Sequence, residues 1–257
     1  MANAGLLKKV LKSVMELIQD ANLLVSESGL GLQAMDTSHV SLVSMLLRAE
    51  GFEHFHCDRN MLLGVNLAAV CKVVKCANTN DAVTMMAGND ETTLSFVFEN
   101  PKTDRKAEFS LKLMHIDSYD LHITDVDYDA TVTMSSADLQ RVGRDLAVLG
   151  DTIVIDVTPE AVNFSVNGDE GSGGMTFRQR TGGAAAAGAA AAGSMTIVTE
   201  AGARLSFSLR LINLFTKATP LSKTVSLHLL KDHPLSVEYR IADAGWLRFY
   251  LAPRMED

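Results

Sequence analysis

The sequence predicts an α+β protein of two similar domains, each with two helices packed on antiparallel strands. The main observation is an internal repeat, in which the second half of the chain follows the pattern of the first half. Leu7 aligns with Leu139 at a separation of 132 residues, and Lys75 aligns with Lys217 at a separation of 142 residues. A chain of 257 residues is long enough to bury a separate core in each copy.

Each copy opens with an amphipathic helix that leads into a β-hairpin. In residues 6–32, apolar side chains recur at helical spacing and are followed by two strands around a Ser-Glu-Ser-Gly turn. Residues 138–164 repeat this pattern with a Thr-Pro-Glu-Ala turn, and a second helix is expected from residue 67 in the first copy and after residue 209 in the second. The apolar faces of the opening helices comprise Leu7, Val10, Leu11, Val14, Leu17 and Ile18 in the first copy, and Leu139, Val142, Leu146 and Leu149 in the second.

The spacing of the repeat also predicts the domain boundaries. The separation grows between the two helices of the second copy, where residues 182–194 read GGAAAAGAAAAGS, so this run is expected to be a loop inside the second domain. We expect domains at 1–116 and 130–257, joined by an acidic connector at 117–129. A strand expected at 129–136 has its counterpart mostly before the first residue, so the first domain is expected to lack its opening strand.

The charge and the cysteine content restrict the class of protein. A net charge of -8 excludes a surface that is basic all over but allows a local basic stripe. Three cysteines do not make a disulfide framework, so we expect Cys57, Cys71 and Cys76 to be free thiols in a reducing compartment. The chain begins with an amphipathic pattern instead of the apolar core of a signal peptide, and no apolar stretch of about 18 residues predicts a membrane span. We therefore expect a soluble protein with no membrane partner.

Three stretches resemble ligand-binding motifs without meeting the requirements of those motifs. Residues 29–34 fit the glycine pattern of a dinucleotide site, but a strand-like sequence follows where a helix is required. Residues 168–174 are rich in glycine but lack the lysine of a phosphate loop, which favours a hairpin turn. Residues 125–129 space their carboxylates as a calcium loop does, but the required glycine and final glutamate are absent. We therefore expect neither a cofactor nor calcium.

The strongest enzyme-like cluster is the stretch HFHCD at residues 54–58. On a strand, His54 and His56 lie on one face and Cys57 on the other, so the three converge on a zinc ion only around a bulge. The histidine-bearing segments carry no nucleophile-elbow sequence. We expect no catalytic residue and no metal site, and a metal-dependent enzyme that uses these three residues is a distant alternative.

Basic residues recur on the polar faces of all four expected helices. This distribution in an acidic chain implies that the acidic residues are concentrated elsewhere, and a segregated basic field suits phosphate groups. No aromatic residues interleave with these cations and no base-reading module is evident, so contacts to a nucleic-acid backbone, indifferent to its sequence, are expected. The candidate DNA-binding residues are Lys8, Lys9, Lys12, Lys72, Lys75, Arg141, Arg144, Arg210 and Lys217.

Four stretches of the chain resemble a known family. They are LQAMDTSHVSLV at 32–43, CDRNMLLGVNLAAVCKVVKCA at 57–77, LFTKATPLS at 214–222 and VEYRIADAGWLRFYLAP at 237–253. These stretches are similar to proliferating cell nuclear antigen, the family of eukaryotic sliding DNA clamps. The resemblance covers nearly the whole chain and implies the DNA clamp fold, in a closed nuclear homotrimer that encircles double-stranded DNA. It also implies a protein that is not an enzyme and serves as a polymerase processivity factor in DNA replication and DNA repair. A subunit of a heteromeric checkpoint-type clamp is the close alternative.

The same resemblance implies which surfaces meet other proteins. DNA polymerase, the clamp loader and other partners are expected to insert a short hydrophobic peptide beside the connector. Subunits are expected to pair through two edge strands, which match 107–116 and 174–181. The expected partner-binding residues are Met35, His39, Val40, Leu121, Ile123, Tyr128, Pro234, Tyr250, Leu251, Ala252 and Pro253.

The chain also departs from the family at specific positions. Pro159 stands where relatives carry a lysine that accepts ubiquitin, so that modification is not expected there. Met15 and Val148 replace basic residues that face DNA in many relatives, and Thr124 replaces a proline of the connector.

Overall fold

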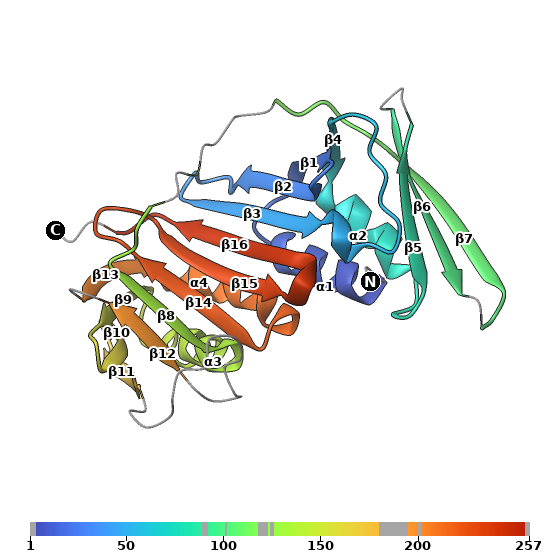
Figure 1. Ribbon diagram of the computed structural model, residues 1–257. Helices are drawn as coiled ribbons and strands as arrows, with labels where there is room; N and C mark the ends of the chain where they lie inside the picture. The colour runs from blue at the N-terminus through green and yellow to red at the C-terminus, as the bar shows by residue number, and fades with distance from the viewer. Residues whose placement is uncertain are drawn as a thin grey trace. The chain divides into compact units, whose positions relative to one another are not determined.

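The chain forms two compact units in the computed structural model (Figure 1). The first unit comprises Met1–His122 and Ile241–Leu247, and the second comprises Ile123–Arg240 and Arg248–Asp257. The structure describes residues 4–88, 92–100, 102–117, 123, 126–179, 195–199 and 202–254. The expected loop at 182–194 lies outside these residues, as do Leu121 and Thr124 of the connector.

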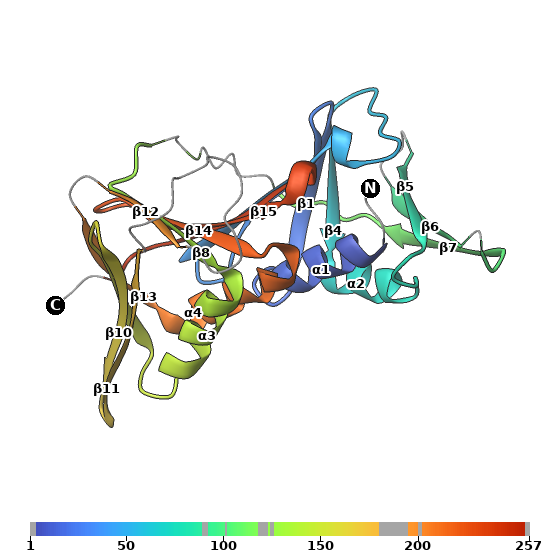
Figure 2. The same ribbon diagram turned by 60° about the horizontal axis from the view of Figure 1, so that its bottom comes forward.

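The first unit contains two helices and two antiparallel sheets. One sheet has the strand order β3-β2-β1-β4 and the other has the order β5-β6-β7. The helices α1 and α2 pack against each other (Figure 2). The elements are α1 (Ala4–Val14), β1 (Asp20–Ser26), β2 (Gly29–Met35), β3 (Ser41–Arg48), the 3-10 helix η1 (Ala49–Gly51), β4 (Met61–Asn66), α2 (Leu67–Lys75), β5 (Ala82–Ala87), β6 (Thr93–Asn100), β7 (Arg105–Lys112) and η3 (Ala242–Ala244).

The second unit repeats this arrangement with an additional strand before its first helix. Its sheets have the orders β12-β8-β14-β15-β16 and β11-β10-β9-β13, and α3 packs against α4. The elements are β8 (Ala130–Ser135), α3 (Ser136–Leu146), β9 (Thr152–Val157), β10 (Ala161–Gly168), β11 (Gly171–Arg178), β12 (Thr196–Thr199), β13 (Ala203–Ser208), α4 (Leu209–Phe215), η2 (Thr216–Leu221), β14 (Thr224–Leu229), β15 (Leu235–Ile241) and β16 (Gly245–Leu251), whose first three residues belong to the first unit.

The strand registers confirm the internal repeat. Leu23 pairs with Leu32 between β1 and β2, and the residues 132 positions later, Ile155 and Phe164, pair between β9 and β10. The expected apolar faces of α1 and α3 are also confirmed, because their side chains are buried, except that Leu7 and Leu149 are half-buried. The periodicity of apolar residues therefore predicted correctly which side of each opening helix faces the core.

The two units differ at the start of their first helices. In the second unit β8 lies between β12 and β14, and the Ser136 amide then donates to the Lys223 carbonyl. The equivalent bond in the first unit joins the Ala4 amide to the Asp81 carbonyl at 3.2 Å. β5 is the counterpart of β14, which pairs with β8 on one edge. Among the described residues, however, no strand pairs with the corresponding edge of β5. Residues 1–3, which precede Ala4, are not among the described residues.

Of two expectations about individual segments, one is wrong and one is confirmed. Residues 54–58 form bends and coil, not a strand. The repeat offset of 142 residues makes 54–57 the counterpart of β12, which pairs with β8. In the first unit, no described strand corresponds to β8, so residues 54–57 have no described strand with which to form hydrogen bonds. The hairpin turn expected within residues 168–174 is confirmed, because Asp169 and Glu170 form the turn between β10 and β11 and Gly168 pairs with Gly171.

Candidate nucleic-acid interface

The basic residues of the first unit lie mainly on the exposed sides of its two packed helices. Lys9 and Lys12 are exposed on α1, and Lys72 and Lys75 are exposed on α2. Their spacing of three residues places each pair on one side of its helix. The helix pair therefore presents four cations to the surroundings of the first unit.

The second unit presents a similar set. Arg210 is exposed at the start of α4, and Lys217 is exposed in η2, the turn that continues this helix. Arg141 and Arg144 are exposed on α3, and both form ion pairs with Asp145, at 3.2 Å and 3.0 Å. The hydrogen bond from Arg144 is the largest cause of the lowered pKa of Asp145, so this carboxylate reduces the positive charge of α3.

Six of these cations form three pairs that occupy equivalent positions of the repeat. The registers align α1 with α3 at a separation of 132 and α2 with α4 at 142. In this alignment Lys9 is equivalent to Arg141, Lys12 to Arg144 and Lys75 to Lys217. Each unit therefore carries exposed positive charge at equivalent positions of its helices.

Lys8 has a different environment from the other candidates. It is half-buried, and its Nζ donates to the Ala77 carbonyl just beyond α2 at 2.6 Å. Its equivalent in the second unit is Gln140, whose Nε2 donates to the Thr216 carbonyl just beyond α4 at 3.2 Å. In each unit this hydrogen bond joins the first helix to the residues that follow the second helix. The geometry therefore assigns Lys8 a structural role.

The turn between β2 and β3 carries the expected partner-binding residues of the first unit. The Asp36 carboxylate accepts hydrogen bonds from Ser38, the Val40 amide and the Ser41 amide. Burial would raise the pKa of Asp36, but these hydrogen bonds outweigh burial and lower it. His39 has a positive φ of 55° in this turn. The turn leaves Met35, His39 and Val40 exposed, which makes its apolar side chains available to a ligand.

The remaining partner-binding candidates belong to the second unit. Ile123 and Pro234 are exposed, and Ala252 and Pro253 are half-buried after the end of β16. Tyr250 and Leu251 are buried, and the Tyr128 ring lies 5.0 Å from the His228 ring between centroids. Leu121 lies outside the described residues. The segment after β16 thus offers apolar surface that directly follows the buried Tyr250 and Leu251.

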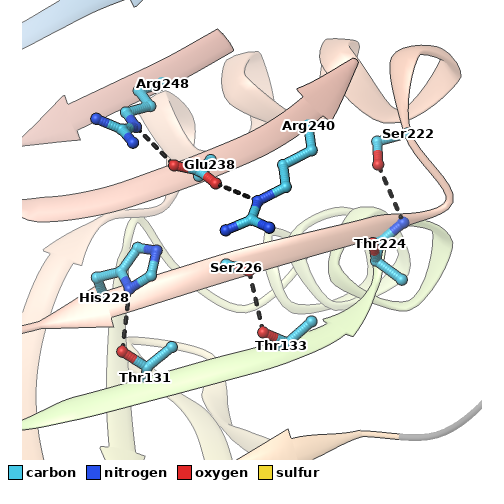
Figure 3. Close-up of polar contacts among 9 residues, drawn as sticks. All are labelled: Thr131, Thr133, Ser222, Thr224, Ser226, His228, Glu238, Arg240 and Arg248. Carbon is cyan, nitrogen blue, oxygen red and sulfur yellow. Dashed lines mark hydrogen bonds and ion pairs between the residues drawn. The ribbon is translucent and has the colours of Figure 1, made fainter. Parts of the chain in front are cut away.

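A polar cluster on β14, β15 and β16 was not anticipated from the sequence (Figure 3). Glu238 on β15 is only 6% exposed, and its two carboxylate oxygens accept hydrogen bonds from Arg240 Nε at 2.8 Å and from Arg248 Nε at 2.6 Å. Burial would raise the pKa of Glu238, but the two arginines outweigh burial and hold this pKa below its usual value. The alternation of Ser236, Glu238 and Arg240 along β15 was the available signal for a polar face.

The same face includes hydroxyl and imidazole groups. His228 Nδ1 on β14 lies 3.0 Å from Thr131 Oγ1 on β8, and Ser226 Oγ lies 3.0 Å from Thr133 Oγ1. Burial lowers the pKa of His228, despite the opposing effect of Glu238. Side chains from four strands therefore form one continuous polar surface.

The structure does not bring His54, His56 and Cys57 together at a metal. His56 forms an ion pair with Asp58, and the Cys57 thiol donates to the Arg59 carbonyl. In the described part of the chain, no three His, Cys, Asp or Glu side chains are placed to share a metal ion. The described helices also include none that is long and apolar enough to cross a membrane.

Comparison with protein families identifies both units. Residues 1–122 match the family described as "Proliferating cell nuclear antigen, N-terminal domain". Residues 122–254 match "Proliferating cell nuclear antigen, C-terminal domain". The α+β architecture with few helices and antiparallel sheets agrees with the clamp fold of this family. Because the two matches together span nearly the entire chain, the protein belongs to the proliferating cell nuclear antigen family of sliding DNA clamps.

Proposed function

We propose that the protein is a non-enzymatic, nuclear replicative clamp that assembles as a homotrimer around double-stranded DNA and tethers DNA polymerase. The observation that carries this proposal is the recurrence of exposed cations at equivalent positions of the two units, Lys75 and Lys217 among them. A ring would present these charges repeatedly to the phosphates around a duplex. Exposed charges in salt solution bind phosphates weakly, and weak contacts permit sliding.

The ring size is compatible with this arrangement. The described residues of each chain form four α-helices, which gives twelve in a trimer, and helices spaced about 10 Å apart then define a circle about 38 Å in diameter. Subtracting a helix width of about 10 Å leaves an opening wider than a DNA duplex of about 20 Å. A dimer would have only eight helices, and its opening would be too narrow.

Charge reversal at Lys75 and Lys217 tests the DNA-facing role of the helices. The double variant Lys75→Glu, Lys217→Glu should lower the processivity of a clamp-dependent polymerase at least about tenfold, because six phosphate-facing cations per trimer become anions. The Tm should change little, because exposed charges contribute little to folding. Primer-extension length on a singly primed circle measures processivity.

The matched control reverses two exposed cations outside the helices. Arg48 ends β3 and Lys102 lies in the turn between β6 and β7, so Arg48→Glu, Lys102→Glu makes the same change in net charge. This control should keep normal processivity. Equal processivity in both double variants would show that the helix faces do not contact DNA.

We also propose that polymerase and other partners bind through a short peptide with one aliphatic and two aromatic residues. The supporting observations are the exposed apolar side chains of Met35, Val40 and Ile123 and the apolar segment after Tyr250. Exposed apolar side chains favour binding because the ligand removes them from water.

The variant Ile123→Asp tests this partner surface. A buried charge without a partner should weaken peptide binding by at least about a hundredfold while the oligomer stays intact. Val198→Asp is the matched control, because Val198 is an exposed valine on β12. Fluorescence anisotropy with a labelled peptide measures the affinity, and unchanged binding in Ile123→Asp would contradict the proposal.

A further inference from the structure

We propose that Arg240 and Arg248 bind a phosphate monoester carried by a partner protein, next to its hydrophobic clamp-binding peptide. This inference rests on the proposed function, because the peptide supplies the occupant. The two arginines lie on the polar face of β14, β15 and β16 described above (Figure 3). This site adds a contact selective for anions to the binding of a peptide that otherwise depends on apolar side chains.

The first argument is the way in which Glu238 positions the arginines. It uses one carboxylate oxygen for each arginine, and each arginine uses its Nε for this contact. The side chain of Arg240 is 81% exposed, and its terminal nitrogens form no hydrogen bond with another described residue. Arg248 is 33% exposed and also hydrogen bonds with Tyr250. Glu238 therefore orders two guanidinium groups and leaves donors of at least Arg240 for a ligand.

The second argument is the charge of the cluster. Two guanidinium groups and one carboxylate give a net charge of +1, and the neighbouring side chains of β8 and β14 in Figure 3 are hydroxyls and the imidazole of His228. In Figure 3 the guanidinium of Arg240 extends over β14 toward Ser226. Planar guanidinium groups bind phosphate through paired charge-assisted hydrogen bonds, and hydroxyl groups provide further donors.

The third argument distinguishes a phosphorylated protein from a nucleic acid. Nucleic-acid backbones need a track of cations that follows successive phosphates. Arg240 and Arg248 are the only arginines or lysines within the described strands β8, β14, β15 and β16, and one carboxylate already partly neutralises them. A single phosphate is the ligand that this local charge fits.

The fourth argument is the continuity with the proposed peptide surface. Arg248 and Tyr250 project from the same strand, two residues apart, and their side chains are hydrogen bonded. Two residues of strand span about 7 Å. A peptide that reaches Tyr250 and the segment after it can therefore place a flanking phosphoserine at Arg248 and Arg240.

The test compares peptides with and without phosphate. A clamp-binding peptide is synthesised with phosphoserine at successive positions beyond each end of its hydrophobic core, and affinities are measured by fluorescence anisotropy. Phosphate at a matching position should strengthen binding about tenfold, as expected for charge-assisted hydrogen bonds. This gain should disappear in Arg240→Gln and in Arg248→Gln, and the unphosphorylated peptide should keep its affinity for Arg240→Gln.

The control variant is Arg204→Gln, which removes another exposed arginine of the second unit that is paired with a single carboxylate, Asp156. It should keep the gain. Thermal melts of the variants verify folding, and Arg240→Gln is the primary variant because its side chain is the more exposed.

The outcomes separate the two proposals. Normal binding of the unphosphorylated peptide without any gain from phosphate, or a gain that survives both arginine variants, overturns the phosphate site alone. No binding of either peptide contradicts the proposed peptide surface. Phenyl phosphate then tests the arginine site directly by NMR. Shifts of the Arg240 and Arg248 Nε–H signals support the site, and their absence overturns it. A larger response to a single-stranded oligonucleotide at equal phosphate concentration would assign the site to nucleic acid and also overturn the inference.

Discussion

At the scale of single residues, His228 and Glu238 show how a strand surface accommodates ionisable groups away from water. Glu238 remains charged because two arginines compensate for the loss of hydration. His228 faces Thr131, the Tyr128 ring and the nearby charges of Glu238, Arg240 and Arg248, and burial is the main cause of its lowered pKa. The two groups therefore respond to acid over different pH ranges.

The lowered pKa of His228 predicts a loss of stability in mild acid. The unfolded chain takes up a proton near pH 6.5, whereas the folded protein resists protonation until a lower pH. Folding is unaffected by this group above pH 6.5 and becomes less favourable as the pH falls through and below that value. His228→Asn should therefore lose less Tm than the unaltered protein between about pH 7.5 and about pH 5.5. Thermal melts at both pH values measure the difference, and equal losses would contradict it.

At the scale of elements, Gly143 on α3 leaves room for the Asn213 side chain of α4. Asn213 Nδ2 on α4 donates to the Gly143 carbonyl at 3.0 Å, and a Cβ at Gly143 would lie 2.3 Å from Asn213 Oδ1. The equivalent positions of the first unit are Leu11 and Cys71, which are both buried. Where the two helices meet, the second unit therefore has a polar contact between Gly143 and Asn213, whereas the first unit has the apolar residues Leu11 and Cys71 at these positions.

This crossing predicts that an alanine substitution destabilises the protein despite its preference for helix. Replacing Gly143 by Ala should gain about 1 kcal/mol of helix propensity, but the clash and the lost hydrogen bond should cost about 2–4 kcal/mol. Gly143→Ala should therefore lower the free energy of unfolding by about 1–3 kcal/mol. Adding Asn213→Ala should restore part of this loss. Denaturant unfolding measures both variants, and additive effects in the double variant would exclude the proposed clash.

At the scale of the whole molecule, two open edges suggest how copies assemble. β7 ends the sheet β5-β6-β7 of the first unit, and β11 ends the sheet β11-β10-β9-β13 of the second. These strands overlap the segments 107–116 and 174–181 that the family resemblance assigns to subunit contact. Two different edges that pair head to tail generate a closed ring when the rotation permits.

We therefore predict a homotrimer with a mass of about 83 kDa, three times the 27.7 kDa of one chain. Light scattering at micromolar protein concentration measures the mass. A protein that stays monomeric over this range would contradict the homotrimer. Assembly only after the addition of different clamp subunits would favour the heteromeric checkpoint-type alternative.

The family, the repeat and the exposed basic helix faces could all be predicted from the sequence. Helical periodicity depends on local geometry, so Val10 and Val142 were assigned correctly to buried faces without knowledge of the tertiary structure. The recurrence of Lys75 and Lys217 was visible from the same alignment of the two halves. The DNA-binding and partner-binding roles of the surface residues stay predictions until the experiments above are done.

The features that depend on contacts between distant segments could not be predicted without the folded structure. Residues 54–57 are the counterpart of β12, and β12 forms its hydrogen bonds with β8. No described strand takes the place of β8 in the first unit, and residues 54–57 form no strand. Lys8 resembles the other helix lysines in sequence but bonds to the Ala77 carbonyl 69 residues away. Glu238 is joined to Arg248 by the pairing of separate strands. Hydrogen bonds and ion pairs require partners at defined positions, and these positions arise only when the chain has folded.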